Sequence, residues 1–295
     1  GRGIGTTYAD KYGRIGIRAV DLLDDDVFYE KLKIALELKN YLLKEYYKEK
    51  ILNADKIYND YKEIREKIKK YIINGTIFIN DMLAKGKKVL AEGAQGTFLD
   101  IDFGTYPYVT ASNPISGGSC TGLGISPTKI DKVIGIVKAY TTRVGKGPFP
   151  TEMKGLLEDT LRRSGNEYGA TTGRPRRCGW FDSVIVRFAS IVNGLDEIFI
   201  TKLDVLSGIE KLKIGVAYKY DGKIYNEYPM NMKVFSNCEV IYEEMDGWSE
   251  SISDIKEYSK LPTNAKKYIE RIQELIEVKI SAISVGSERE QIIKI

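Results

Sequence analysis

The sequence predicts an α/β fold in which helices flank a central, mostly parallel sheet, with a helical subdomain near the amino end. Two observations support this prediction. Helical patterns fill residues 24–88, and from Val89 onward short apolar runs alternate with glycine-rich turns and patterned helices. A chain of 295 residues can bury a sizeable core. We expect residues 1–295 to form a single domain that contains residues 24–88 as a helical subdomain.

Two apolar stripes predict the helices of 24–88. The first stripe follows three aspartates that can cap its start, and consists of Phe28, Leu32, Leu36, Leu42 and Tyr46. The second stripe steps by threes and fours, and consists of Ile57, Tyr61, Ile64, Ile68 and Ile72. We interpret the two stripes as a helical hairpin that packs on the main body, because packing explains such stripes more simply than binding does.

The elements of the α/β part follow in order. An apolar run predicts a strand at Val89, directly before the glycine turn EGAQGT. Further apolar runs predict strands at 197–200, 211–218 and 279–284, and amphipathic patterns predict helices at 181–192 and 262–277. Pro262 suits the first turn of the last helix. Strands that alternate with helices in this way favour a parallel central sheet.

Composition excludes several classes of function. The net charge of +4 comes from 45 basic and 41 acidic residues, which is too balanced for a nucleic-acid binder without a basic face. No apolar run approaches the roughly 20 residues that span a bilayer. Three dispersed cysteines indicate free thiols and a cytoplasmic location. The chain has no histidine, so any acid–base chemistry needs carboxylates, lysine, tyrosine or groups from outside the chain.

Two glycine-rich segments are candidates for ligand binding. In EGAQGT, small residues let a ligand approach the backbone, and Gln95 offers both a donor and an acceptor. Glycine turns are common, so spacing alone favours a plain turn there. The segment 104–124 is rich in glycine and hydroxyl side chains that suit phosphate or carboxylate. A flexible surface loop explains it equally well.

A cluster of arginines is the sharpest candidate. Arg174, Arg176 and Arg177 lie beside threonines and glycines in GATTGRPRRCGW. Guanidinium groups bind carboxylates and phosphates with two parallel hydrogen bonds, and glycine lets backbone amides join them. The cluster ends at Trp180 rather than on a polar helix face. We therefore prefer a small anionic ligand to a solvated run of charge.

Two further candidates follow predicted strands. Asp204, in TKLD, can accept hydrogen bonds from the N1 and N2 groups of guanine, and the stem of Lys202 can lie along a purine ring. Open α/β sheets bind ligands beyond the carboxyl ends of their strands. The four-residue match is weak by itself, because Asp204 could also cap a helix. Ser284, Val285 and Gly286 could close a base pocket or form a simple turn.

Taken in order, these segments closely resemble the adenylosuccinate synthetase family. The resemblance runs through GRGIG, EGAQGTFLDIDFGTYPYVT, AYTTRVGKGPFPTE, GNEYGATTGRPRRCGWFD, TKLDVLSG and SVGSERE, and covers nearly the whole chain. It implies a fold like that of the P-loop NTPases. It also implies GTP- and Mg²⁺-dependent phosphorylation of the 6-oxygen of IMP, followed by displacement of the phosphate by the amino group of L-aspartate. The products are adenylosuccinate, GDP and phosphate.

The resemblance also implies roles for individual residues. Gln95 hydrogen-bonds near the reacting 6-position of IMP, Thr110 holds the IMP phosphate, and Arg14 reaches across a homodimer into the partner's IMP site. Arg174 contacts both IMP and aspartate, and Arg176 also lies near GTP. The expected aspartate loop is Ala170, Thr171, Thr172, Gly173, Arg174, Pro175 and Arg176. The expected guanine pocket is Lys202, Leu203, Asp204, Ser284, Val285 and Gly286.

The sequence departs from the family at its amino end. Family members carry a phosphate-binding loop there, with an aspartate that acts as base and binds Mg²⁺, and then a histidine. None of these occurs in the chain, which opens abruptly on GRGIG. We therefore expect a chain truncated at the amino end, with its Mg²⁺ ligands and catalytic residues in the missing region. Phosphoryl transfer depends on positioning, so we expect no useful turnover from this polypeptide alone.

Two alternatives remain open. The first is a catalytically silent module that binds GTP or IMP, which differs from the enzyme only in what precedes Gly1. The second is an RNA-binding protein that uses the cluster from Arg174 to Arg177. It would bind oligonucleotides in a strongly salt-dependent way and would show no preference for GTP over ATP. The near-balanced charge argues against this second alternative.

Overall fold

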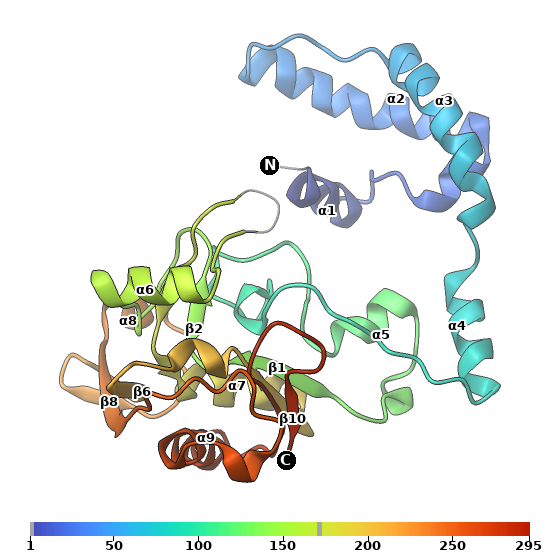
Figure 1. The fold of residues 1–295 in the computed structure, drawn as a ribbon. Coiled ribbons are helices and arrows are strands. Elements are labelled where there is room, and N and C mark those ends of the chain that lie inside the picture. The colour runs from blue at the N-terminus through green and yellow to red at the C-terminus, as the bar shows by residue number, and fades with distance from the viewer. Residues whose placement is uncertain (1–2, 170–172) are drawn as a thin grey trace. The chain divides into compact units, whose positions relative to one another are not determined.

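The computed structural model describes residues 3–169 and 173–295. These residues form two compact units. The first unit comprises Gly1–Glu92, Thr110–Asn113 and Ser119–Ile125, and the second comprises Gly93–Val109, Pro114–Gly118 and Ser126–Ile295. In Figure 1 the long helices of the first unit are blue and cyan, and the strands of the second unit run from green to red.

Helices dominate the first unit, as the sequence predicts for 24–88. They are α1 (Ile4–Tyr12), α2 (Asp25–Tyr41), α3 (Ala54–Ile68) and α4 (Gly75–Ala84), and α5 (Gly118–Leu123) follows later in the chain. Asp24, Asn53 and Asn74 cap α2, α3 and α4, because each side chain accepts a hydrogen bond from a backbone N–H of the first turn. Helix α1 begins at Ile4, within the sequence GRGIG.

The first apolar stripe is buried over part of its predicted length. Phe28, Leu32 and Leu36 of α2 form a small core, as predicted. Leu42 and Tyr46 are exposed, so their predicted burial is wrong. They lie in a π-helical turn, Leu42–Tyr46, which turns less per residue than an α-helix. Both residues lie beyond the end of α2 at Tyr41, so the regular packing of α2 does not extend to them.

The second stripe is also partly exposed, because α3 buries an arginine. Tyr61 and Ile64 are exposed, whereas the side chain of Arg65 is 1% exposed. Its guanidinium donates to the carbonyl oxygen of Leu22 at 3.1 Å and pairs with Asp25. It also lies over the rings of Phe28 and Tyr58 at 5.0 and 5.6 Å. The hydrogen bonds and the two aromatic rings together offset the cost of burying this charge. A stripe of apolar residues does not predict a buried arginine.

The second unit contains the predicted mostly parallel sheet. Its strand order is β1 (Ile134–Lys138), β5 (Glu197–Thr201), β9 (Ile280–Ser284) and β10 (Ile292–Lys294). Strands β1, β5 and β9 pair in parallel, and β10 adds an antiparallel edge. The strands predicted at 197–200 and 279–284 are β5 and β9, and both are confirmed.

The other strands form sheets that the sequence did not predict. The strand predicted at 211–218 is part of β6 (Lys211–Tyr220), which pairs in parallel with β4 (Phe181–Asp182) and antiparallel with β7 (Lys223–Tyr225) and β8 (Glu239–Asp246). A further antiparallel pair joins β2 (Thr141–Arg143) to β3 (Arg177–Gly179). The architecture is therefore α/β with mixed sheets.

The strand predicted at Val89 is absent. The segment from Val89 to Gln95 has no regular structure and pairs with no strand in the described part of the chain. Leu90 is 89% exposed, so its apolar character does not reflect burial. A strand needs a hydrogen-bonded neighbour, and an apolar run alone does not supply one.

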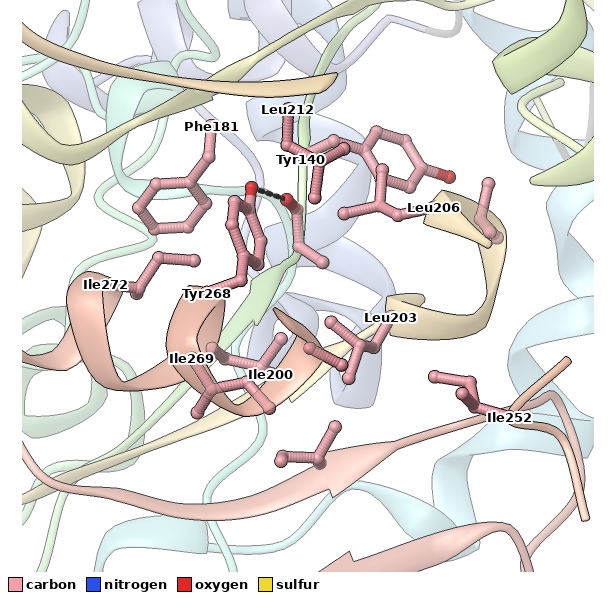
Figure 2. Close-up of a cluster of buried hydrophobic side chains, with 14 of the residues drawn as sticks. Tyr140, Phe181, Ile200, Leu203, Leu206, Leu212, Ile252, Tyr268, Ile269 and Ile272 are labelled. Carbon is pink, nitrogen blue, oxygen red and sulfur yellow. Dashed lines mark hydrogen bonds between the residues drawn. The ribbon is translucent and has the colours of Figure 1, made fainter. Parts of the chain in front are cut away.

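Helices cover the sheets of the second unit. They are α6 (Leu156–Ser164), α7 (Ser183–Asn193), α8 (Met232–Asn237) and α9 (Thr263–Ile276). The helix predicted at 262–277 is α9, and that predicted at 181–192 is α7, preceded by β4. Helix α9 buries Tyr268, Ile269 and Ile272 in the main core. The Tyr268 hydroxyl donates to the carbonyl oxygen of Ala139 at 2.8 Å (Figure 2), which ties α9 to the residue that follows β1.

Candidate functional site

The candidate site begins at the carboxyl ends of three parallel strands. Lys138, the last residue of β1, is paired with Thr201, the last residue of β5. In the neighbouring pair, Ile200 of β5 lies opposite Ile283 of β9. The segments that follow β5 and β9 therefore leave the sheet at the same edge. This is the edge at which open α/β sheets bind their ligands.

The segment after β5 holds a carboxylate oxygen without a partner. Lys202 is followed by a short 3-10 helix, Leu203–Leu206, whose Leu203 and Leu206 are fully buried and fix its backbone. Among the described residues, the buried Oδ1 atom of Asp204 accepts no hydrogen bond. Burial raises the pKa of Asp204 above its ordinary value. Buried polar atoms are normally paired, so this oxygen points to a ligand that donates hydrogen bonds.

Strand β9, which ends at Ser284, contacts this 3-10 helix. Val285 is fully buried, and its backbone N–H donates to the carbonyl oxygen of Gln291 at 2.9 Å. The hydroxyl of Ser284 donates to the carbonyl oxygen of Gly286 at 2.6 Å. A Cβ atom on Gly286 would come within 2.0 Å of the Gln291 side chain, so a larger residue there would require that side chain to move. The structure thus places β9, which ends at Ser284, beside the 3-10 helix that carries Asp204.

The arginine segment forms a narrow hairpin. Tyr168 pairs with Pro175, and the Gly169 N–H donates to the carbonyl oxygen of Arg174 at 2.8 Å. Gly173 has φ 62°, a backbone conformation that favours glycine. The Arg174 side chain is exposed and has no partner among the residues described. Three predicted aspartate-loop residues, Ala170, Thr171 and Thr172, lie outside the described residues.

The three clustered arginines do not act together. Arg177 binds both carboxylate oxygens of Glu152 at 2.5 Å and also donates to the carbonyl oxygen of Gly147 at 2.9 Å. Arg176 instead pairs with Glu167. Arg174 is therefore the exposed guanidinium of the three, and the expected cluster is divided among separate partners. A continuous basic face of the kind that RNA binding needs is not formed by these arginines.

Glu167 is a central residue that the sequence analysis missed. Its carboxylate is fully buried and accepts hydrogen bonds from Lys138 at 2.7 Å, Tyr140 at 2.6 Å and Arg176 at 2.8 Å. Burial acts to raise the pKa of Glu167, but the hydrogen bonds from Lys138 and Tyr140 outweigh it and leave the pKa lowered. The carboxylate is therefore ionised and joins the arginine hairpin to the end of β1. Its signal in the sequence is a lone glutamate in GNEYG, which reveals none of these partners.

A second missed residue, Arg143, supports the glycine-rich loop. Its guanidinium donates to the Thr105 hydroxyl at 2.8 Å and to the carbonyl oxygen of Tyr108 at 3.1 Å. Burial, and then the neighbouring Arg177, hold the pKa of Arg143 below its ordinary value. Within the described part of the chain, Arg143 forms no ion pair with a carboxylate. Arg143 thus fixes the loop through neutral oxygens.

Three predicted site residues share an unusual backbone conformation. Arg14, Gln95 and Lys202 have φ values of 62°, 67° and 64°, in the left-handed region. This conformation costs a residue other than glycine roughly 1 kcal/mol, and such strain often occurs where a side chain has a functional position. Gln95 and Lys202 belong to the second unit, whereas Arg14 belongs to the first.

The remaining predicted site residue, Thr110, lies in the first unit with Arg14. Its hydroxyl is half-buried and lies 3.4 Å from the Ser112 hydroxyl. Arg14 is exposed just after α1, and its N–H donates to the carbonyl oxygen of Lys11 at 3.1 Å. Both side chains are therefore at least partly exposed.

The described residues contain no group of three or more histidine, cysteine, aspartate or glutamate side chains that could hold a metal ion. None of the helices described is long and apolar enough to cross a membrane.

Three comparisons with known proteins identify the same family. A family model for adenylosuccinate synthetase matches residues 1–293. Adenylosuccinate synthetases from Caldanaerobacter subterraneus and Thermodesulfovibrio yellowstonii are 53% and 55% identical over 99% of this chain, which spans 68% and 69% of their lengths. The structure of fully ligated adenylosuccinate synthetase from Plasmodium falciparum matches with a TM-score of 0.93 and 41% identity. That match covers 100% of this chain and 69% of the other. The chain belongs to the adenylosuccinate synthetase family.

Proposed function

We propose that this chain binds GTP, IMP and L-aspartate for the GTP-dependent synthesis of adenylosuccinate, a ligation that forms a C–N bond in purine biosynthesis. The observation that carries the proposal is the buried, unpartnered Oδ1 atom of Asp204 at the carboxyl edge of the sheet. Guanine offers N–H donors at N1 and N2 that a carboxylate can accept together. Adenine has no such donor pair, so this residue favours GTP over ATP.

The guanine pocket is assigned to the segments that follow β5 and β9. Asp204 accepts hydrogen bonds from the base, and the stem of Lys202 lies along it. The Lys202 ammonium is already fixed, because it donates to the carbonyl oxygen of Gly165 at 2.7 Å. Leu203, Ser284, Val285 and Gly286 complete the walls. Arg176 lies on the GTP side, with its Nη1 atom bound to Glu167.

The other substrates are assigned to the arginine hairpin and the glycine-rich loops. Arg174, exposed on the hairpin, binds the carboxylates of aspartate and also contacts IMP, and residues 170–176 form the aspartate loop. Gln95 binds near the 6-position of IMP, and Thr110 binds its phosphate. Arg14 is assigned to the IMP site of the partner in a homodimer. These roles match the chemistry of each side chain: guanidinium groups for anions, an amide for the purine edge and a hydroxyl for phosphate.

The reaction proceeds in two steps. The 6-oxygen of IMP attacks the γ-phosphorus of GTP, which releases GDP and gives 6-phosphoryl-IMP. The amino group of aspartate then attacks C6, and the phosphate leaves with the former 6-oxygen. Within this chain, Gln95 supports the reacting 6-position, and we assign no general base here. Mg²⁺ neutralises the phosphates of GTP, and we assign none of its ligands to this chain.

An isotope experiment tests this function. The full-length protein from which this chain is expected to be truncated, called the enzyme from here on, is incubated with GTP, L-aspartate and IMP that carries ¹⁸O at the 6-position. We expect adenylosuccinate and GDP in equal amounts, with the ¹⁸O in the released phosphate. ATP in place of GTP is the control and should give little product. Unlabelled phosphate would exclude the phosphorylated intermediate, and binding of GTP and IMP without product would favour a silent binding module.

A further inference from the structure

The buried carboxylate of Glu167 connects two parts of the proposed site. One of its oxygens, Oε2, accepts hydrogen bonds from both Lys138 at 2.7 Å and Arg176 at 2.8 Å. The other, Oε1, accepts from Tyr140 at 2.6 Å and from Lys138 at 2.8 Å. Lys138 ends β1, and Arg176 belongs to the hairpin, so one carboxylate fixes a strand end and a loop against each other.

The backbone around Glu167 reinforces this connection. The Arg176 N–H donates to the carbonyl oxygen of Glu167 at 2.9 Å, which sets the register of the hairpin. Two residues earlier, the carbonyl oxygen of Gly165 accepts the Lys202 ammonium at 2.7 Å. Residues 165–167 therefore contact both the arginine hairpin and the segment that carries Asp204.

The charges explain why a carboxylate is needed at this position. Burial is the largest cause that lowers the pKa of Lys138. Arg176 and Lys202 lie close enough to Lys138 that their positive charges also lower this pKa. Like charges at such separations repel, and more strongly where water is excluded. The Glu167 carboxylate offsets this repulsion and gives two of the cations a common acceptor. Its own burial is tolerated because it is fully hydrogen-bonded.

The arrangement leaves Arg176 free to bind a ligand. Of its side-chain nitrogen atoms, Nη1 is bound to Glu167, whereas Nε and Nη2 have no acceptor among the residues described. Its side chain is 30% exposed. An arginine held at one end in a fixed orientation loses less conformational entropy when it binds phosphate than a mobile arginine does.

We propose that Glu167 is a positioning residue for GTP, which holds Arg176 and Lys138 at the carboxyl edge of the sheet so that Arg176 meets the nucleotide in a fixed orientation. This inference rests on the proposed function. It predicts that loss of the carboxylate weakens GTP use and leaves the binding of IMP unaffected. A purely structural Glu167 would instead lower stability without changing the Michaelis constant for one substrate alone.

The substitution Glu167→Gln tests the proposal, because the amide keeps the size but loses the charge. Steady-state kinetics of the enzyme should show the KM for GTP raised roughly tenfold or more, which corresponds to the loss of one charge-assisted hydrogen bond. The KM for IMP should stay within about twofold of the wild-type value. The matched control is Glu243→Gln on β8, which breaks a similar two-bond pair with Arg271 of α9. It should leave the KM for GTP unchanged.

A double-mutant cycle identifies the residue through which Glu167 acts. If Glu167 works by orienting Arg176, then Glu167→Gln should raise the KM for GTP much less in an Arg176→Leu background than in the wild type. Additive effects would overturn the proposed route. Tyr140→Phe provides a second, milder variant if Glu167→Gln does not fold. It removes one hydrogen bond to Glu167 and should raise the KM for GTP about threefold.

The outcomes separate this inference from the proposed function. A wild-type enzyme that forms no adenylosuccinate with GTP would contradict the proposed function itself. The positioning role alone would be overturned by a different pair of results. In that case the wild-type enzyme forms adenylosuccinate, and the Glu167→Gln variant has either an unchanged KM for GTP or KM values for GTP and IMP that rise equally.

Discussion

At the scale of single residues, some side chains of the predicted site can be identified from the sequence and others cannot. Lys202, Asp204 and Arg174 stand in distinctive local motifs, so the sequence could nominate them. Glu167 and Arg143 could not be found in this way, because their importance comes from partners far along the chain. Glu167 meets Lys138 across 29 positions, and Arg143 meets Thr105 across 38.

The exposed guanidinium of Arg174 leads to a prediction about aspartate. The change Arg174→Leu removes a donor that can bind a carboxylate with two hydrogen bonds, so we expect the KM for aspartate to rise roughly 10- to 100-fold. Steady-state kinetics with varied aspartate measures this change. Arg163→Leu, which removes another exposed arginine from α6, should leave it unaffected. A normal KM for aspartate in the Arg174 variant would contradict the assignment.

At the scale of elements, local sequence patterns correctly predicted the helices and strands whose buried residues follow a regular spacing. Strands β5 and β9 and helix α9 were predicted close to their observed bounds, because apolar alternation and an amphipathic stripe report directly on the core. The prediction of a strand at Val89 was wrong, because a strand needs a neighbouring strand to pair with and the local sequence does not reveal one. Helix α3 buries Arg65, which depends on Asp25 and Leu22 and therefore escaped a rule based on apolar spacing.

Asp182 joins three elements and leads to a prediction about pH. It ends β4, accepts a hydrogen bond from the Ile185 N–H in the first turn of α7, and accepts the Tyr218 hydroxyl of β6 at 2.8 Å. Burial raises the pKa of Asp182 from 3.8 to about 7. The folded state therefore holds this proton more tightly than the unfolded state. The contribution of Asp182 to stability is fully present below about pH 4 and decreases as the pH rises to about 7.

The change Asp182→Asn should remove this pH dependence. Each pKa unit corresponds to about 1.4 kcal/mol, so between pH 4.5 and pH 8 the wild type should lose roughly 3 kcal/mol more than the variant. Urea unfolding at pH 4.5 and pH 8 measures the difference. Trp180 and Trp248 are suitable fluorescent probes because both lie in the second unit with Asp182. Equal pH dependence in the two proteins would show that Asp182 does not titrate in this way.

At the scale of the whole molecule, the sequence predicted the class of the fold better than its topology. Alternating strands and helices indicated an α/β protein, and the β1–β5–β9 core of the sheet is parallel as expected. The sheet around β6 is mostly antiparallel, which local patterns could not reveal because pairing direction depends on how distant strands meet. The family resemblance is confirmed, since relatives match almost the whole chain.

The central claim is that Asp204, in the 3-10 helix that follows β5, recognises the guanine base through hydrogen bonds. Replacement of Asp204 by asparagine tests this most directly, because the amide presents one donor and one acceptor where the carboxylate presents two acceptors. Xanthine matches the amide, since its 2-position carries an oxygen instead of an amino group. Asp221→Asn, in the exposed turn after β6, is the control. We expect the Asp204 variant to use xanthosine triphosphate in preference to GTP, and an unchanged preference for GTP would contradict the claim.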